Sequence, residues 1–298
     1  MTRKKTKAGF ALVLGGGGAR GLAHIGVLKV LEREGLTPEY IVGTSMGAIV
    51  GGMYAQQPSA KAVEERIKRL IQSRPFRRIV VDGFAHEPAP DGVGTTSVLY
   101  GRVKRGYGMF KSAWSTGIVD SAVLLDFLSH LIDDVRIEEC EIPFAAVACD
   151  IYAGEEVICK TGSMLKSIAA SSAIPGIISP ISLNGRTLVD GAPTSTVPVL
   201  ATRSLSAFPR VAVDVTKNVA RSKPVRNAID VMLRAGVISR MQVTRHNLEQ
   251  AAVVLWPKVG DYGWADFSAC DQFIAEGERA AKTAIRRIRA AMKSRLKV

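Results

Sequence analysis

Four consecutive glycines near the N-terminus constrain the fold of this chain more than any other feature. Gly15–Gly18 follow the apolar residues 10–14, which we expect to form a buried strand, and precede residues 20–34, whose apolar side chains recur at helical spacing. A glycine-rich turn between a strand and a helix allows several backbone N–H groups to point into one concavity at the helix start. The sequence therefore predicts an anion-binding turn that opens an α/β domain.

Two kinds of anion suit such a turn. Residues Gly16–Gly21 spell G-x-G-x-x-G, the dinucleotide-binding fingerprint, which points to an oxidoreductase using a nicotinamide or flavin dinucleotide. That fold also requires an acidic residue at the end of the second strand, whereas Glu39 comes before the expected strand 40–42. The other anion is the oxyanion of a tetrahedral acyl-transfer intermediate.

The segment Gly43–Gly47, G-T-S-M-G, favours the oxyanion. It is a G-x-S-x-G pentapeptide between a short β-branched strand and a helix of small residues, which is the setting of a nucleophile elbow. In such a turn Ser45 is raised at the carboxyl edge of the sheet, beside the glycine turn. The alternative is a serine that merely caps the following helix. The two glycine turns together favour a nucleophilic serine.

A serine nucleophile needs a base, and the histidines are poorly placed to supply it. His246 falls inside the expected long helix 225–250, and His24 follows the glycine turn on a helix, where a packing or capping role is expected. Three aspartates end expected strands: Asp150, Asp190 and Asp214. Spacing does not choose among them, and each could serve an Asx turn or a helix cap. Asp190 has the best local context, because Gly191 follows it in a tight turn.

Four blocks in this order resemble the bacterial patatin-like phospholipases: GGGGARG (Gly15–Gly21), GTSMG (Gly43–Gly47), AASSAIPGIISPI (Ala169–Ile181) and DGA (Asp190–Ala192). The resemblance spans about residues 15–192 and implies a three-layer α/β fold with a mainly parallel central sheet flanked by helices. It also implies a cofactor-independent lipid acyl hydrolase, of phospholipase A or lysophospholipase type, that works through an acyl-enzyme. The third motif departs mildly from the family, because D-G-A stands in place of D-G-G.

The resemblance assigns roles to individual residues. It implies Ser45 as nucleophile, Asp190 as general base, and an oxyanion hole made by the N–H groups of Gly16, Gly17 and Gly18. The supporting motif positions are Gly15, Arg20, Gly21, Gly43, Gly47, Gly191 and Ala192. Arg20 could bind a lipid phosphate or steady the loop by pairing with a carboxylate, and the position suits a helix-start arginine that only packs or pairs equally well. A catalytically idle lipid-binding protein with the same motifs is the alternative from a different functional class.

We expect one catalytic domain over residues 10–298, preceded by a basic tail, 1–9. Residues 74–118 lack periodicity and are a candidate flap over the site, and residues 269–298 form a basic C-terminal helix. That helix either packs on the domain or lies on an anionic membrane through a partial apolar stripe that includes Ala284 and Ile288.

The net charge of +13 favours an anionic lipid surface over nucleic acid, because no basic motif interleaved with aromatic residues is present. No apolar run approaches the roughly 20 residues of a membrane span. The four cysteines are scattered and no metal-ligand spacing is found, so we expect free thiols and no metal site. We expect a cytoplasmic protein that makes peripheral contact with the inner face of the membrane. The oligomeric state cannot be inferred from the sequence.

Overall fold

The computed structural model describes residues 9–73, 116–117, 119–216, 224–225, 227–260, 262–263 and 265–294. Apart from Gly9, the expected basic tail lies outside these residues. So does the expected flap, 74–118, except for residues 116 and 117.

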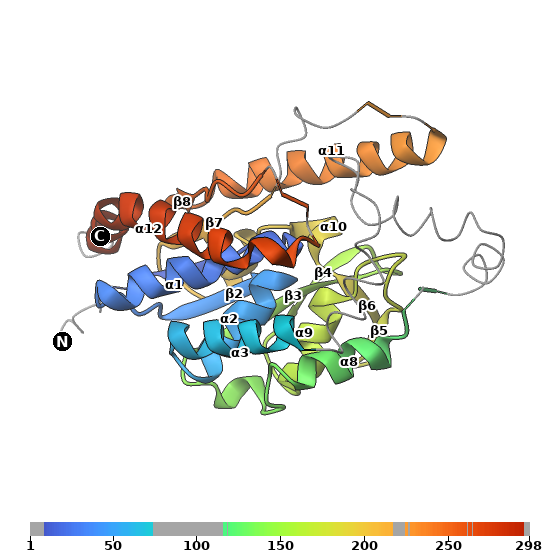
Figure 1. Ribbon diagram of the computed structural model, residues 1–298, viewed down its shortest axis with the longest axis horizontal. Helices are drawn as coiled ribbons and strands as arrows, with labels where there is room; N and C mark the ends of the chain where they lie inside the picture. The colour runs from blue at the N-terminus through green and yellow to red at the C-terminus, as the bar shows by residue number, and fades with distance from the viewer. Residues whose placement is uncertain are drawn as a thin grey trace.

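A mixed sheet of eight strands forms the middle layer of the described chain (Figure 1). The strands are β1 (Ala11–Leu14), β2 (Tyr40–Thr44), β3 (Phe144–Asp150), β4 (Glu155–Cys159), β5 (Ile181–Leu183), β6 (Arg186–Asp190), β7 (Arg210–Val213) and β8 (Val253–Leu255). Their order is β5-β6-β3-β2-β1-β7-β8, and β4 pairs with β3 off this path. The strands from β3 to β8 in this order run parallel, while β4, β5 and β6 are antiparallel to their neighbours. The expected α/β fold with a mainly parallel sheet is confirmed.

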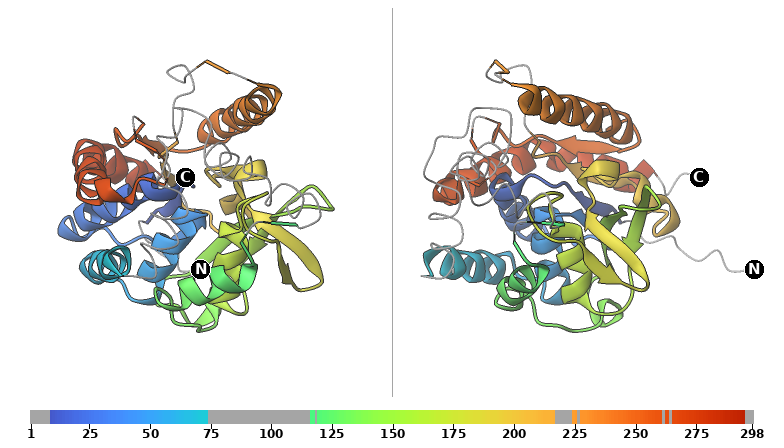
Figure 2. Two further views of the ribbon diagram at one scale, coloured as in Figure 1. Left: turned by 45° about the vertical axis from the view of Figure 1, so that its right-hand side comes forward. Right: turned by 90° about the vertical axis from the view of Figure 1, so that its right-hand side faces the viewer.

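Helices cover both faces of the sheet. They are α1 (Ala23–Arg33), α2 (Met46–Gln56), α3 (Ala60–Gln72), α8 (Ser121–Ser129), α9 (Met164–Ser172), α10 (Ala192–Ser195), α11 (Ala228–Leu248) and α12 (Cys270–Ser294). Leu12 and Leu14 of β1 face a large core shared with α1, α2, α9 and α12, whereas Val13 faces a smaller core beside Val197 and Leu248. Because side chains alternate along a strand, one buried strand supplies both cores. The left view of Figure 2 shows α1, α3 and α12 on one side and α10 and α11 on the other.

The C-terminal helix packs against α1 at very close range. A Cβ built on Gly26 would lie 1.9 Å from the carbonyl oxygen of Ile274, and one on Gly277 would lie 1.9 Å from that of Ala23. Only glycine permits this approach, so the two helix backbones meet where both side chains are absent. Ala284 and Ile288 are buried in the same layer. At Ala284 and Ile288 the C-terminal helix therefore packs on the domain, and these two side chains are not part of an exposed membrane-binding stripe.

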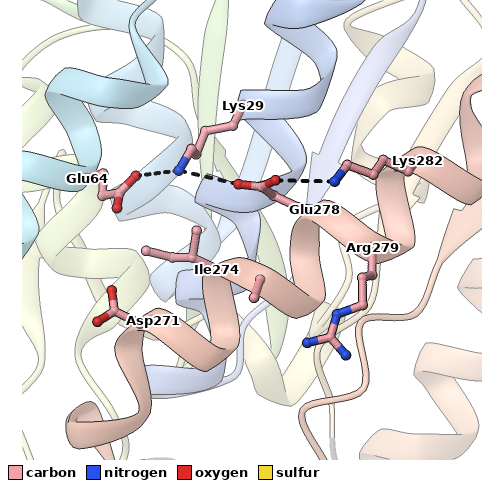
Figure 3. A pocket seen from close by; sticks show the side chains of 8 residues that line it. Lys29, Glu64, Asp271, Ile274, Glu278, Arg279 and Lys282 are labelled. Atoms are coloured by element: carbon pink, nitrogen blue, oxygen red, sulfur yellow. Dashed lines mark hydrogen bonds and ion pairs between the residues drawn. The ribbon is translucent and has the colours of Figure 1, made fainter.

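Ion pairs join α12 to α1 and α3 along a charged groove on the outer surface (Figure 3). Lys29 lies between Glu64, at 2.9 Å, and Glu278, at 3.3 Å, and Lys282 approaches Glu278 at 3.6 Å. Exposed pairs of this kind each contribute little to stability, but a connected set favours one register of the helices. We interpret the groove as a structural seam, since its acids and bases are already paired with one another.

Candidate active site

Ser45 lies on a strained turn between β2 and α2. Its backbone angles, φ 55° and ψ −124°, belong to a region that residues with a side chain rarely adopt. The flanking glycines make the turn possible: a Cβ on Gly43 would lie 2.4 Å from the Gly47 carbonyl oxygen, and one on Gly47 would lie 2.1 Å from that of Leu14. This is the geometry of a nucleophile elbow, in which the serine side chain is raised above the sheet edge.

The backbone of Ser45 is held by a serine that the sequence motifs did not single out. The Ser45 N–H donates to the hydroxyl of Ser171 at 3.0 Å, and that hydroxyl donates to the Val147 carbonyl at 2.6 Å. Ser171 is fully buried on α9, so the link ties the turn to the strand beside it. Its signal in the sequence was its place in the block Ala169–Ile181, to which no individual role could be given.

The sheet register places Asp190 beside Ser45. On β3, Val147 pairs with Thr44 of β2, and the next residue, Ala148, pairs with Asp190 of β6. Strand β4 pairs with β3 at both positions, so β2 and β6 lie end to end along the opposite edge of β3. The carboxyl ends of the two strands therefore meet, and the side chain of Ser45 lies close enough to the Asp190 carboxylate to lower its pKa.

The carboxylate of Asp190 is in an environment that makes it a stronger base than an exposed aspartate. It is 3% exposed, and this burial raises its pKa to about 6. Three groups oppose this rise in pKa: the Ser45 side chain, the Ala192 N–H, which donates to the carboxylate at 2.8 Å, and the positive charge of Arg240. A base whose pKa lies near neutral pH suits proton abstraction from a hydroxyl.

The other two aspartates hold local turns. Asp150 accepts the N–H groups of Tyr152 and Ala153 at 3.1 and 3.2 Å and thereby shapes the β3–β4 hairpin. Asp214 accepts the Thr216 N–H at 2.9 Å. In the part of the chain that the structure describes, Asp190 is thus the one strand-end aspartate linked to Ser45.

The glycine turn lies against the serine turn, and its first half is anchored to the sheet. A Cβ on Gly16 would lie 3.2 Å from that of Ser45. The Gly15 N–H donates to the Val213 carbonyl at 3.1 Å, and the Gly16 N–H donates to the Thr196 carbonyl at 2.8 Å. Gly16 was expected to donate to the oxyanion, but its N–H already donates to the Thr196 carbonyl. Of the three expected oxyanion donors, Gly17 and Gly18 remain.

The second half of the turn presents two N–H groups that have no acceptor among the described residues. Neither Gly17 nor Gly18 donates a backbone hydrogen bond to any residue within the described ranges. Gly18 has a φ of 59°, a left-handed conformation that favours glycine, and it begins the short 3-10 helix Gly18–Leu22 that leads into α1. Two adjacent N–H groups at a helix start form an anion-binding nest.

Two side chains hold the carbonyl groups of this turn. Nε2 of His24 donates to the Gly15 carbonyl at 2.8 Å, and Nε of Arg20 donates to the Gly17 carbonyl at 3.2 Å. Burial lowers the pKa of His24 to about 4 and that of Arg20 to about 10, the latter effect being opposed by the charge of Asp214. His24 is therefore neutral and supports the loop, while Arg20 holds the Gly17 carbonyl and the charge of Asp214 acts on its guanidinium.

His246 does not have the buried setting of a catalytic base. Its side chain is 72% exposed on α11 and lies 3.6 Å from Glu249.

Within the described residues, no cluster of three or more His, Cys, Asp and Glu side chains could bind a metal ion. Nor is any helix there long and apolar enough to cross a membrane. The four cysteines are free thiols.

Comparisons with known proteins agree with this geometry. Residues 12–203 match the family model described as patatin-like phospholipase. An uncharacterised NTE family protein of Mycobacterium tuberculosis is 34% identical over 218 residues, which are 73% of this chain and 51% of that protein. Patatin-like phospholipase domain-containing protein 6 of Homo sapiens is 30% identical over 217 residues, 72% of this chain and 14% of that protein. This chain thus spans about half, or much less, of the length of these relatives.

The solved structure of VipD from Legionella pneumophila has a similar fold. It aligns with a TM-score of 0.50 at 12% identity, covering 96% of this chain and 68% of that chain. At this identity the likeness concerns the fold alone. The family match includes both glycine turns and the aspartate turn, and it sets aside the dinucleotide-dependent oxidoreductase that Gly16–Gly21 suggested.

Proposed function

Because this chain belongs to the patatin-like phospholipase family, we propose that it is a lipid acyl hydrolase, a serine esterase of phospholipase A or lysophospholipase type, with a Ser45–Asp190 dyad. One observation carries the proposal. The serine of a strained strand-turn-helix lies beside a buried carboxylate, on which it acts and whose pKa burial raises to about 6. The glycine turn beside it offers the N–H groups of Gly17 and Gly18 as oxyanion donors.

In the proposed acylation step, the ester carbonyl oxygen lies in the nest of Gly17 and Gly18. Asp190 accepts the proton of the Ser45 hydroxyl while the serine oxygen attacks the carbonyl carbon. The negative charge of the tetrahedral intermediate then lies on the former carbonyl oxygen, where the two N–H groups stabilise it. As the intermediate collapses, the carbon–oxygen bond to the alcohol breaks and Asp190 returns its proton to the leaving oxygen. An acyl group remains on Ser45.

Deacylation reverses these roles. A water molecule gives a proton to Asp190 and its oxygen attacks the acyl carbon, again with the oxyanion in the nest. Collapse breaks the bond to the serine oxygen, which recovers the proton from Asp190, and the fatty acid leaves. No histidine and no cofactor enters either step. A basic protein of net charge +13 in the cytoplasm would meet its lipid substrate at an anionic membrane face.

Release of fatty acid from dispersed phospholipid, lysophospholipid and neutral esters tests the proposal. We expect Ser45→Ala and Asp190→Asn to lose release on every ester that the wild type cleaves. Ser182→Ala, which changes an exposed serine of β5, is the matched control and should retain it. Release that persists in the folded Ser45→Ala protein would place the nucleophile elsewhere. A wild type that binds these lipids without cleaving them would support the catalytically idle alternative.

A further inference from the structure

Helix α11 lies beyond the residues of the family match and packs against α10, the short helix that follows Asp190 (Figures 1 and 2). Its C-terminal end is anchored: Nδ2 of Asn247 donates to the hydroxyl of Ser195 at 3.2 Å, and Thr244 and Asn247 are both buried. Ser195 ends α10, the short helix that follows the Asp190 turn. The anchor therefore fixes one face of α11 directly above the segment that carries the base.

Arg240 lies on this anchored face, closer to the N-terminus of the helix. It precedes Asn247 by about two helical turns, so the two side chains leave the helix in nearly the same direction. The side chain is half-buried, and its positive charge acts on the Asp190 carboxylate. The anchoring of α11 thus brings a cation to the edge of the site.

Apart from its effect on Asp190, the guanidinium of Arg240 has no electrostatic partner among the described residues. Its side chain makes no ion pair and no hydrogen bond with any described residue, and its pKa is lowered by burial. A guanidinium that served only to neutralise Asp190 would be expected at ion-pair distance from it. Instead its N–H donors have no acceptor among the described residues, and they lie in a partly desolvated position where an anion is bound more strongly than in water.

We propose that Arg240 binds the phosphodiester oxygens of the substrate and selects phosphate-bearing acyl esters over neutral glycerides. The ligand chemistry is that of a phosphate group, because the planar guanidinium donates paired hydrogen bonds to phosphate oxygens. In a glycerophospholipid one glycerol unit carries both the ester and the phosphate. A cation whose charge acts on the base, without pairing with it, can therefore bind the phosphate while the ester lies at Ser45. This inference rests on the proposed function and specifies its substrate class.

A matched pair of substrates isolates the phosphate. 1-Oleoyl-lysophosphatidylglycerol and 1-oleoylglycerol share the acyl chain and the glyceryl ester, and only the former carries a phosphodiester. For Arg240→Gln we expect kcat/KM on the lysophospholipid to fall about 10- to 100-fold, mainly through KM, because a charge-assisted hydrogen bond is lost. On 1-oleoylglycerol the change should stay within about twofold, since that ester has no group for Arg240 to bind. Arg240→Lys should restore part of the loss.

Two choices separate recognition from a merely structural role. The kinetics are measured at pH 8.5, where Asp190 is ionised with or without the nearby cation, so an altered pKa of the base does not enter. Arg245→Gln, which removes an exposed arginine of the same helix, is the control and should leave both substrates unaffected. An equal loss on both substrates for Arg240→Gln, or no loss on either, would overturn the proposal. Turnover of the neutral ester also reports that the variant is folded.

A binding measurement keeps this test independent of catalysis. In the Ser45→Ala background, calorimetric titration with 1-oleoyl-lysophosphatidylglycerol should show affinity about tenfold higher with Arg240 than with glutamine at this position. If neither ester is hydrolysed by the wild type, the proposed function fails while this comparison still decides the role of Arg240. Inorganic phosphate is titrated in parallel. Phosphate that binds as tightly as the lysophospholipid would identify a free-anion site and contradict the assignment to the substrate.

Discussion

Replacing Asp190 by asparagine should abolish activity and at the same time stabilise the fold at neutral pH. The carboxyl is 3% exposed, and burial raises its pKa from the ordinary value of 3.8 to about 6. Between these two pH values the folded protein holds the proton more tightly than the unfolded chain, so the stability of the wild type falls as pH rises. Each pH unit of the difference is worth about 1.36 kcal/mol. Above pH 6 the ionised carboxylate therefore lowers the free energy of unfolding by about 3 kcal/mol.

Asparagine cannot ionise and still offers an oxygen to the Ala192 N–H, which lies 2.8 Å from the carboxylate in the wild type. The variant should therefore match the wild type near pH 4 and exceed its stability by up to about 3 kcal/mol at pH 8. Urea unfolding of both proteins at pH 4, 5, 6 and 8 measures the difference, with the values at pH 4 as internal reference. A variant that is less stable at pH 8, or a difference that does not change with pH, would refute the argument that burial of Asp190 disfavours its ionised form.

Two further substitutions test close approaches of the backbone. For Gly17→Val, the nearest atom to the new Cβ would be Cγ2 of Val215 at 2.8 Å, so the glycine turn must shift. We expect kcat to fall about 10²- to 10³-fold, as it does when one oxyanion donor is lost. Unchanged ester turnover would argue against an oxyanion hole at Gly17 and Gly18. Gly26→Ala would force α1 and α12 apart and lower the free energy of unfolding by about 1–3 kcal/mol or more in urea titrations. Gly236→Ala, on α11, is the control, because its new Cβ would make only an ordinary contact of 3.8 Å with Nη1 of Arg240. An equal effect of both substitutions would count against the close helix crossing.

The local parts of the site could be predicted from the sequence. The glycine turn and the turn at Ser45 each consist of a strand, a few glycines and a helix that are contiguous in the chain. Their conformations depend on the absence of a Cβ at named positions, as the contact of 2.1 Å at Gly47 illustrates. The helical spacing of apolar side chains expected within residues 20–34 is found in α1, Ala23–Arg33, where Ile25, Leu28 and Leu31 are buried.

The long-range parts could not be predicted in this way. Choosing Asp190 from among three aspartates requires the register of β6 against β3, which depends on pairing between strands far apart in the sequence. The acceptor that engages the Gly16 N–H, the Thr196 carbonyl, is likewise remote in sequence. Ser171 contacts the Ser45 turn, and Arg240 places its charge within range of Asp190, from helices whose inward faces depend on what packs against them. None of these contacts has a periodic signal along the chain.

Covalent labelling with a fluorophosphonate probe, read out by intact mass, tests the Ser45–Asp190 dyad most directly. The reagent phosphonylates an activated serine and requires no knowledge of the natural lipid. We predict one adduct on the wild type, none on Ser45→Ala, and much slower labelling of Asp190→Asn. An adduct that persists in Ser45→Ala, or a labelling rate that does not change in Asp190→Asn, would contradict the assignment of the nucleophile or of its base.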